Sequence, residues 1–80
     1  MLVPLYGFLK GDSIGLLVLI HDHERVSDIA RKLQQAAAVR VAAFASTRVY
    51  HAGRVLKPDW TVAQAGLRAL DRVDVVPEAP

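Results

Sequence analysis

One stretch of this sequence changes its hydrophobic period from that of a strand to that of a helix. From residue 26 onward, apolar side chains recur at three- and four-residue spacing, at Val26, Ile29, Ala30, Leu33, Ala36 and Ala37. This spacing predicts a single amphipathic helix of about three to four turns. Asp28 in its first turn and Arg40 near its expected end suit the two poles of the helix dipole. Short apolar runs make up the rest, so the chain must build one sheet that packs on this helix.

Two apolar runs precede the helix and predict a β-hairpin. Leu2 to Leu9 is the expected first strand, and Pro4 near its start indicates a strand-entry or edge position, because proline cannot donate to a ladder. Ile14 to Ile20 is the expected second strand. The turn signal at residues 10–13 separates the two. Residues 21–25 are polar and predict a loop that leads into the helix.

Short strands follow the helix. Arg48 to His51 and Val55 to Leu56 predict two brief strands joined by a turn at Gly53, and Val73 to Val76 predicts the last strand. The connection between the helix and these strands is poorly patterned. For residues 39–47 the sequence leaves open a loop, an extra helical turn or a strand.

The order of these elements predicts the fold. Thr61 is the expected N-cap of one short helical turn that ends at Gly66, just before the last strand. Hairpin, helix, short strands, helical turn and strand together predict an α+β, ubiquitin-like β-grasp, with a mixed sheet of about four to five strands packed on one helix. In that fold the first and last strands lie side by side in the middle of the sheet. We expect one domain over residues 1–80, with a short flexible tail at 77–80.

The composition argues against several classes of protein. Hydrophobic residues make up 52% of the 80 residues and charged residues 22%, unlike a disordered segment. There is no cysteine, so neither a disulfide nor a Cys-based zinc site can support the core. The net charge is only +2 and the basic residues are dispersed, so we expect no nucleic-acid partner. No apolar run approaches the roughly 20 residues of a membrane span and no signal peptide is evident. We therefore expect a cytoplasmic protein with no membrane partner.

No motif for catalysis stands out. His21, Asp22 and His23 form the one cluster of metal-ligand residue types, but a third ligand would have to come from a distant segment. A solvated loop is the favoured interpretation of that cluster. Neither Ser27 nor Ser46 belongs to a motif that supplies a base and an orienting acid. We expect no enzyme activity, no catalytic or metal-binding residue and no cofactor.

The second strand is apolar on both of its faces. Its even-numbered positions suit the core, while Leu17 and Leu19 lie on the face where a half-solvated strand carries polar residues. That face is open in a β-grasp, so the two leucines predict a protein-interaction surface, which Tyr50 and Val76 extend. The alternative is that residues 41–47 or a bulge cover the leucines.

Trp60 is a further candidate for contact with a partner. It stands beside Pro58 in the segment that precedes the expected helical turn, where an aromatic side chain can anchor an interface. The favoured alternative is that Trp60 caps one end of a small core. The sequence ends in Glu78, Ala79 and Pro80 rather than in Gly-Gly, so we expect no conjugation through the C-terminus.

Four parts of the chain carry a family resemblance. They are Pro4, the turn Lys10 to Asp12, the helix positions Ile29, Ala30 and Lys32, and the segment that holds Leu56, Pro58, Asp59, Thr61, Ala63, Gly66 and Leu67 before Asp74, Val75 and Val76. These residues resemble the toluene-4-monooxygenase system protein B family, the ubiquitin-like small subunit of bacterial multicomponent aromatic hydroxylases. The resemblance implies a non-catalytic accessory subunit that packs on a larger diiron hydroxylase subunit and supplies no iron ligand. The alternative is a free-standing ubiquitin-like interaction module with no oxygenase partner.

Overall fold

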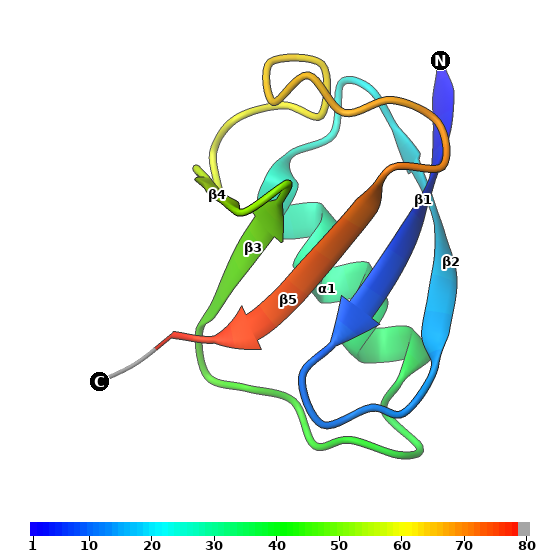
Figure 1. Ribbon diagram of the computed structural model, residues 1–80, viewed down its shortest axis with the longest axis vertical. Coiled ribbons are helices and arrows are strands. Elements are labelled where there is room, and N and C mark those ends of the chain that lie inside the picture. Colours follow the sequence, from blue (N-terminus) through cyan, green and yellow to red (C-terminus); the bar gives the residue numbers. More distant parts are fainter. Residues whose placement is uncertain (79–80) are drawn as a thin grey trace.

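Five strands and one helix make up the computed structural model, which describes residues 1–78 (Figure 1). The elements are β1 (Leu2–Leu9), β2 (Gly15–His21), α1 (Val26–Ala36), β3 (Thr47–His51), β4 (Arg54–Leu56) and β5 (Arg72–Pro77). The strands form one mixed sheet in the order β2-β1-β5-β3-β4. The central pair, β1 and β5, is parallel, and the other pairs are antiparallel. The expected β-grasp arrangement, with first and last strands adjacent, is confirmed.

The helix begins and ends where its backbone finds local partners. Asp28 Oδ2 accepts a hydrogen bond of 3.0 Å from the Arg25 backbone N–H, which fixes the first turn. The helix has 11 residues, about three turns, and ends at Ala36, which agrees with the lower end of the expected three to four turns. Arg40 lies four residues beyond that end, and only its backbone N–H bonds there, to the carbonyl of the C-cap residue Ala37 at 2.9 Å. The expected position of its charge at the helix end is therefore wrong. Its guanidinium instead pairs with Asp12 in the turn between β1 and β2.

The core lies between α1 and one face of the sheet. Alternate strand positions supply Leu5, Ile20 and Val75, and the helix supplies Ile29 and Leu33; all five side chains are fully buried. Gly7 lets the helix approach β1, because an added Cβ would lie 3.0 Å from Leu33 Cδ1. The core therefore depends on one close helix-to-strand contact as well as on apolar side chains.

The segment that the sequence left open, residues 39–47, is an irregular loop up to the start of β3 at Thr47. Val41 and Phe44 in this loop pack against the core. The Phe44 backbone N–H donates a 2.7 Å hydrogen bond to Gln34 Oε1 on α1. The loop is therefore held against the helix side of the molecule and does not cover Leu17 or Leu19.

The segment from Thr61 to Gly66 is one hydrogen-bonded turn, in which the Ala65 backbone N–H donates to Thr61 O at 3.0 Å, the bonding of the single helical turn that was expected. The expected cap is present, because Thr61 Oγ1 accepts from the Gln64 backbone N–H at 3.0 Å. Gln64 Oε1 in return accepts from the Thr61 backbone N–H at 2.9 Å. Gly66 ends the turn with a φ of +73°, a conformation that favours glycine.

Every strand except β1 differs from its expected range by one residue at one or both ends. β2 begins at Gly15 rather than Ile14, because the last residue pair of the hairpin is Phe8 with Gly15. β5 continues to Pro77, and the Glu78 backbone N–H donates to Ser46 O at 3.0 Å. The first half of the expected tail at 77–80 thus contacts the sheet, while its second half, 79–80, lies outside the described residues. Within residues 1–78, no helix has the length and apolar character needed to cross a membrane.

Candidate protein-interaction surface

The outer face of the sheet, opposite α1, carries the two leucines singled out in the sequence. Leu17 is 56% exposed and Leu19 is 50% exposed. The strand register places Tyr6 opposite Leu17 and Pro4 opposite Leu19. We define the hairpin patch as this apolar part of β1 and β2, made of Leu2, Pro4, Tyr6, Leu17 and Leu19. Neither the loop of residues 39–47 nor a bulge covers it.

A second apolar group lies on the other half of the outer face. Tyr50 on β3 is paired with Val55 on β4, and Val76 on β5 is paired with Arg48 on β3. Tyr50 and Val76 are half-buried, and Val55 is 50% exposed. We define Tyr50, Val55 and Val76 as the β3–β5 patch. Tyr50 and Val76 thus share a face with Leu17 and Leu19, as expected, but belong to a separate group.

A charged pair on β5 separates the two patches. The guanidinium of Arg72 contacts the carboxylate of Asp74, with Nη2 3.0 Å from Oδ1, and this pairing raises the pKa of Arg72. The same guanidinium lies over the Phe8 ring, with Cζ 4.0 Å from the ring centroid. The Phe8 ring also lies close to Gly15, where an added Cβ would come within 2.7 Å of it. The Arg72 side chain therefore lies between the patches, in contact with Asp74 and Phe8.

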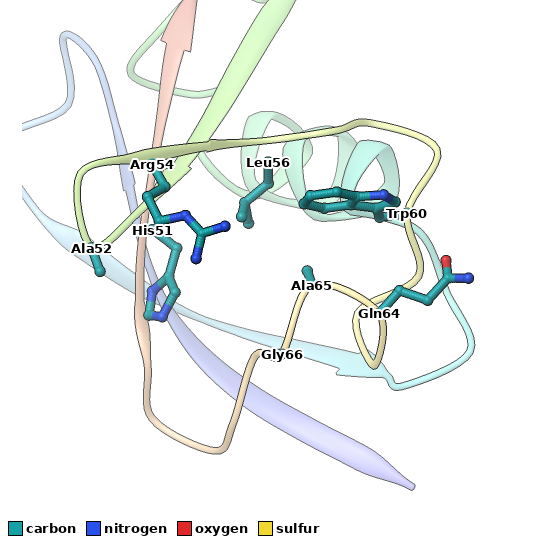
Figure 2. A pocket seen from close by; sticks show the side chains of 8 residues that line it. All are labelled: His51, Ala52, Arg54, Leu56, Trp60, Gln64, Ala65 and Gly66. Atoms are coloured by element: carbon teal, nitrogen blue, oxygen red, sulfur yellow. The ribbon is translucent and has the colours of Figure 1, made fainter.

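Trp60 is not part of the outer face. Its side chain is half-buried and packs against the core, as the core-capping interpretation predicts. Its ring also lines a cavity of about 380 Å³ between the β3–β4 turn and the turn of residues 61–66 (Figure 2). Lys57 Nζ lies 5.7 Å from the centroid of the Trp60 ring.

The histidine cluster before α1 forms local contacts. The His21 and His23 rings stack with centroids 5.3 Å apart. Asp22 Oδ1 accepts a 2.9 Å hydrogen bond from the Met1 amino group, which lowers the pKa of Asp22. Among residues 1–78, no three His, Cys, Asp or Glu side chains are grouped so that they could hold a metal ion.

Several surface residues were not singled out in the sequence. Tyr6 and Phe8 alternate with the buried residues of β1, so strand alternation alone could have placed them on the outer face. No sequence pattern indicated the positions of the Arg72 and Arg54 side chains. The position of Arg72 over Phe8 depends on the parallel register of β1 and β5, and that of Arg54 depends on the tight turn between β3 and β4.

Comparison with known proteins identifies the family. The sequence pattern of the family described as toluene-4-monooxygenase system protein B (TmoB) matches residues 2–76. The chain belongs to this family. Family membership supports the role of an accessory subunit. Among curated protein sequences, none matches the chain.

Solved structures agree with this member of the TmoB family in fold. A chain of the toluene 4-monooxygenase HD complex with the inhibitor 4-bromobenzoate superposes with a TM-score of 0.86 at 23% identity, over 98% of this chain and 100% of that chain. Caldiarchaeum subterraneum ubiquitin gives a TM-score of 0.77 at 17% identity, over 100% and 98% of the two chains. The UBL domain of Plasmodium falciparum Dsk2 gives 0.76 at 17% identity, over 98% and 100%. The ubiquitin-like fold is therefore confirmed.

Proposed function

We propose that this chain is a non-catalytic accessory subunit that docks on a larger diiron subunit of a toluene or aromatic monooxygenase hydroxylase and stabilises that assembly. The contact is made by the outer face, with Leu17 and Leu19 of the hairpin patch and Tyr50 and Val76 of the β3–β5 patch. The observation that carries the proposal is the exposure of Leu17 and Leu19, 56% and 50%, on a face that nothing in the described chain covers. The family match supports the identity of the partner.

Burial of apolar side chains on this surface would favour binding to a partner. Fully burying an exposed leucine contributes about 1.5–3 kcal/mol, so burying the exposed half of Leu17 and of Leu19 contributes roughly 1 kcal/mol each. Tyr6 adds an aromatic side chain beside them, 47% exposed. Interfaces are enriched in tyrosine because its rigid ring covers much area at a low entropic cost. The hairpin patch thus has the composition of an interface centre.

The charges on α1 support a role without iron chemistry. A diiron carboxylate site in a helical bundle takes several Glu and His side chains from facing helices. The one acidic residue on α1 is Asp28, and its oxygens accept from the Arg25 backbone and from Arg31 Nη2 at 3.0 and 3.1 Å. The larger subunit would therefore supply the iron ligands in the proposed assembly.

Coexpression tests the docking proposal. The chain and the large hydroxylase subunit of the same source organism are produced together and separated by size exclusion. We expect the two to co-elute, and we expect the double variant Leu17→Asp with Leu19→Asp to weaken the complex at least about tenfold, because it places two charges in an apolar contact. Circular dichroism of the variant alone checks that its fold is retained.

Val39→Asp is the matched control, because Val39 is 88% exposed but lies in the loop after α1. This variant should bind as the wild type does. Elution of the wild-type chain as a lone monomer in the presence of the large subunit would contradict the proposal. That result would favour the second candidate, a free-standing ubiquitin-like interaction module.

A further inference from the structure

The cavity beside Trp60 is a site separate from the outer face. It lies on the helix side of the sheet, at the end where the β3–β4 turn meets the turn of residues 61–66 (Figures 1 and 2). Its volume is about 380 Å³, within the range of protein ligand sites. Trp60, Leu56 and Ala65 supply its apolar wall, and Arg54 with His51 supply its charged and polar wall.

The tight turn between β3 and β4 places Arg54 in this wall. His51 and Arg54 are a cross-strand pair, so only Ala52 and Gly53 lie between them. Both of those residues have positive φ values, +51° and +78°, as a two-residue hairpin turn requires. Figure 2 shows the Arg54 guanidinium extending from this turn into the hollow.

Within the described part of the chain, the guanidinium of Arg54 has no anionic partner, whereas both ring nitrogens of His51 have neighbours. Among residues 1–78, no carboxylate lies within ion-pair distance of Arg54 or of the neighbouring Lys57. No acidic side chain lines the cavity. By contrast, the His51 Nδ1 contacts the Arg72 backbone carbonyl at 3.0 Å, and its Nε2 lies 3.6 Å from Asp71 Oδ2. An unpaired guanidinium therefore faces an open, half-apolar hollow.

We propose that this cavity receives an acidic side chain of the protein partner, with its carboxylate on Arg54 and its methylene groups against the Trp60 ring. Charge complementarity argues for this occupant, because the planar guanidinium fork matches a carboxylate at two points. Lys57, with its Nζ 5.7 Å from the centroid of the Trp60 ring, adds a second positive charge near that ring. Arginine and tryptophan are also the side chains on which interface energy most often concentrates. This inference rests on the proposed docking and gives it a second, polar contact.

Charge reversal at the cavity tests this contact. In the complex with the large hydroxylase subunit, we expect Arg54→Glu to raise the Kd about 10- to 100-fold, the effect of losing a charge-assisted contact. Arg54→Lys keeps the positive charge but not the planar guanidinium, so its Kd should lie between those of the wild type and Arg54→Glu. Arg68→Glu is the matched control, because Arg68 is exposed at the same end of the molecule but does not line the cavity. It makes the same change in net charge and should shift the Kd less than about threefold.

A second arm uses the free chain, so that failure of the cavity proposal is distinct from failure of docking. A hexaglutamate peptide is titrated into the ¹⁵N-labelled chain at low salt. We expect chemical-shift changes at the Trp60 indole N–H and the Gly66 amide in the wild type and in Arg68→Glu, and not in Arg54→Glu. Equal binding of the large subunit by the wild type and Arg54→Glu would overturn the cavity proposal and leave docking intact. If the wild type does not bind the large subunit, the docking proposal is wrong. The peptide titration then tests the cavity alone: the shift changes would support a carboxylate-binding site, and their absence would overturn it.

Discussion

Asp12 and Arg40 form a two-point ion pair that ties the first turn of the chain to the segment after the helix. Arg40 Nε and Nη2 lie 2.9 Å from Asp12 Oδ1 and Oδ2, respectively. This geometry gives a bidentate pair, the strongest kind of carboxylate contact with a single side chain. The Arg40 guanidinium lowers the pKa of the Asp12 carboxyl below its usual value.

We therefore expect part of the acid sensitivity of this protein to depend on Arg40. Since the pKa of Asp12 is depressed in the folded state, its contribution to stability is present above the unfolded pKa of about 4 and is lost as pH falls through the lower, folded value. Arg40→Gln should thus be less stable than the wild type at pH 7, and the difference should shrink toward pH 2. Urea unfolding across this pH range measures it. A difference in unfolding free energy between the two proteins that stays constant from pH 7 to pH 2 would contradict the prediction.

The sequence predicted some residue positions well and missed others for an identifiable reason. Strand alternation predicted that Leu17 and Leu19 point away from the core, and both are half-exposed. No local pattern could predict the pair of Asp12 with Arg40, because it joins two loops 28 residues apart in the chain. The cavity around Arg54 was missed for the same reason, since its walls come from separate segments.

At the scale of elements, the turn of residues 61–66 depends on its reciprocal cap. Thr61 Oγ1 is the acceptor for the Gln64 backbone N–H, so Thr61→Ala should cost about 1 kcal/mol of unfolding free energy. Thr61→Ser keeps the hydroxyl and should cost much less. Urea unfolding of the two variants measures both values. An equal loss in the two would show that the methyl group of Thr61, not its hydrogen bond, stabilises the turn.

Elements with a strong period were predicted closely, and elements held by distant contacts were not. The first strand and the start of the helix agree with the expected residues, because their alternation and amphipathic spacing are clear. Residues 39–47 could not be assigned because their position depends on Phe44 packing on the core and on Gln34. The single turn after Thr61 was predicted, because its cap and its ending glycine are both local signals.

At the scale of the molecule, the central strands should be the most protected. β1, β5 and β3 each have a hydrogen-bonded neighbour on both sides, but one neighbour of β3 is β4, which has only three residues. β2 and β4 are the two edges of the sheet. We expect the backbone amides of β1 and β5 to exchange with solvent most slowly and those of β4 to exchange fastest among the strands. Native-state hydrogen exchange followed by NMR measures this order. Slowest exchange in β2 would contradict it.

The pairing of the first and last strands in the middle of the sheet was predictable because few arrangements satisfy one helix and several short apolar runs. The division of the outer face was not. It arises from Arg72 lying over Phe8, and these residues meet only because β1 and β5 pair in parallel. The sequence alone therefore predicted an interaction surface but not its two-part form.

The place of β5 also affects how the chain is made. β5 is the last strand in sequence and lies between β1 and β3. Without β5, the β1–β2 hairpin and the β3–β4 hairpin share no backbone hydrogen bonds of the sheet. During synthesis, the sheet cannot close until residues 72–77 have left the ribosome exit tunnel. A nascent chain stalled before that point would present open strand edges to chaperones and to other nascent chains.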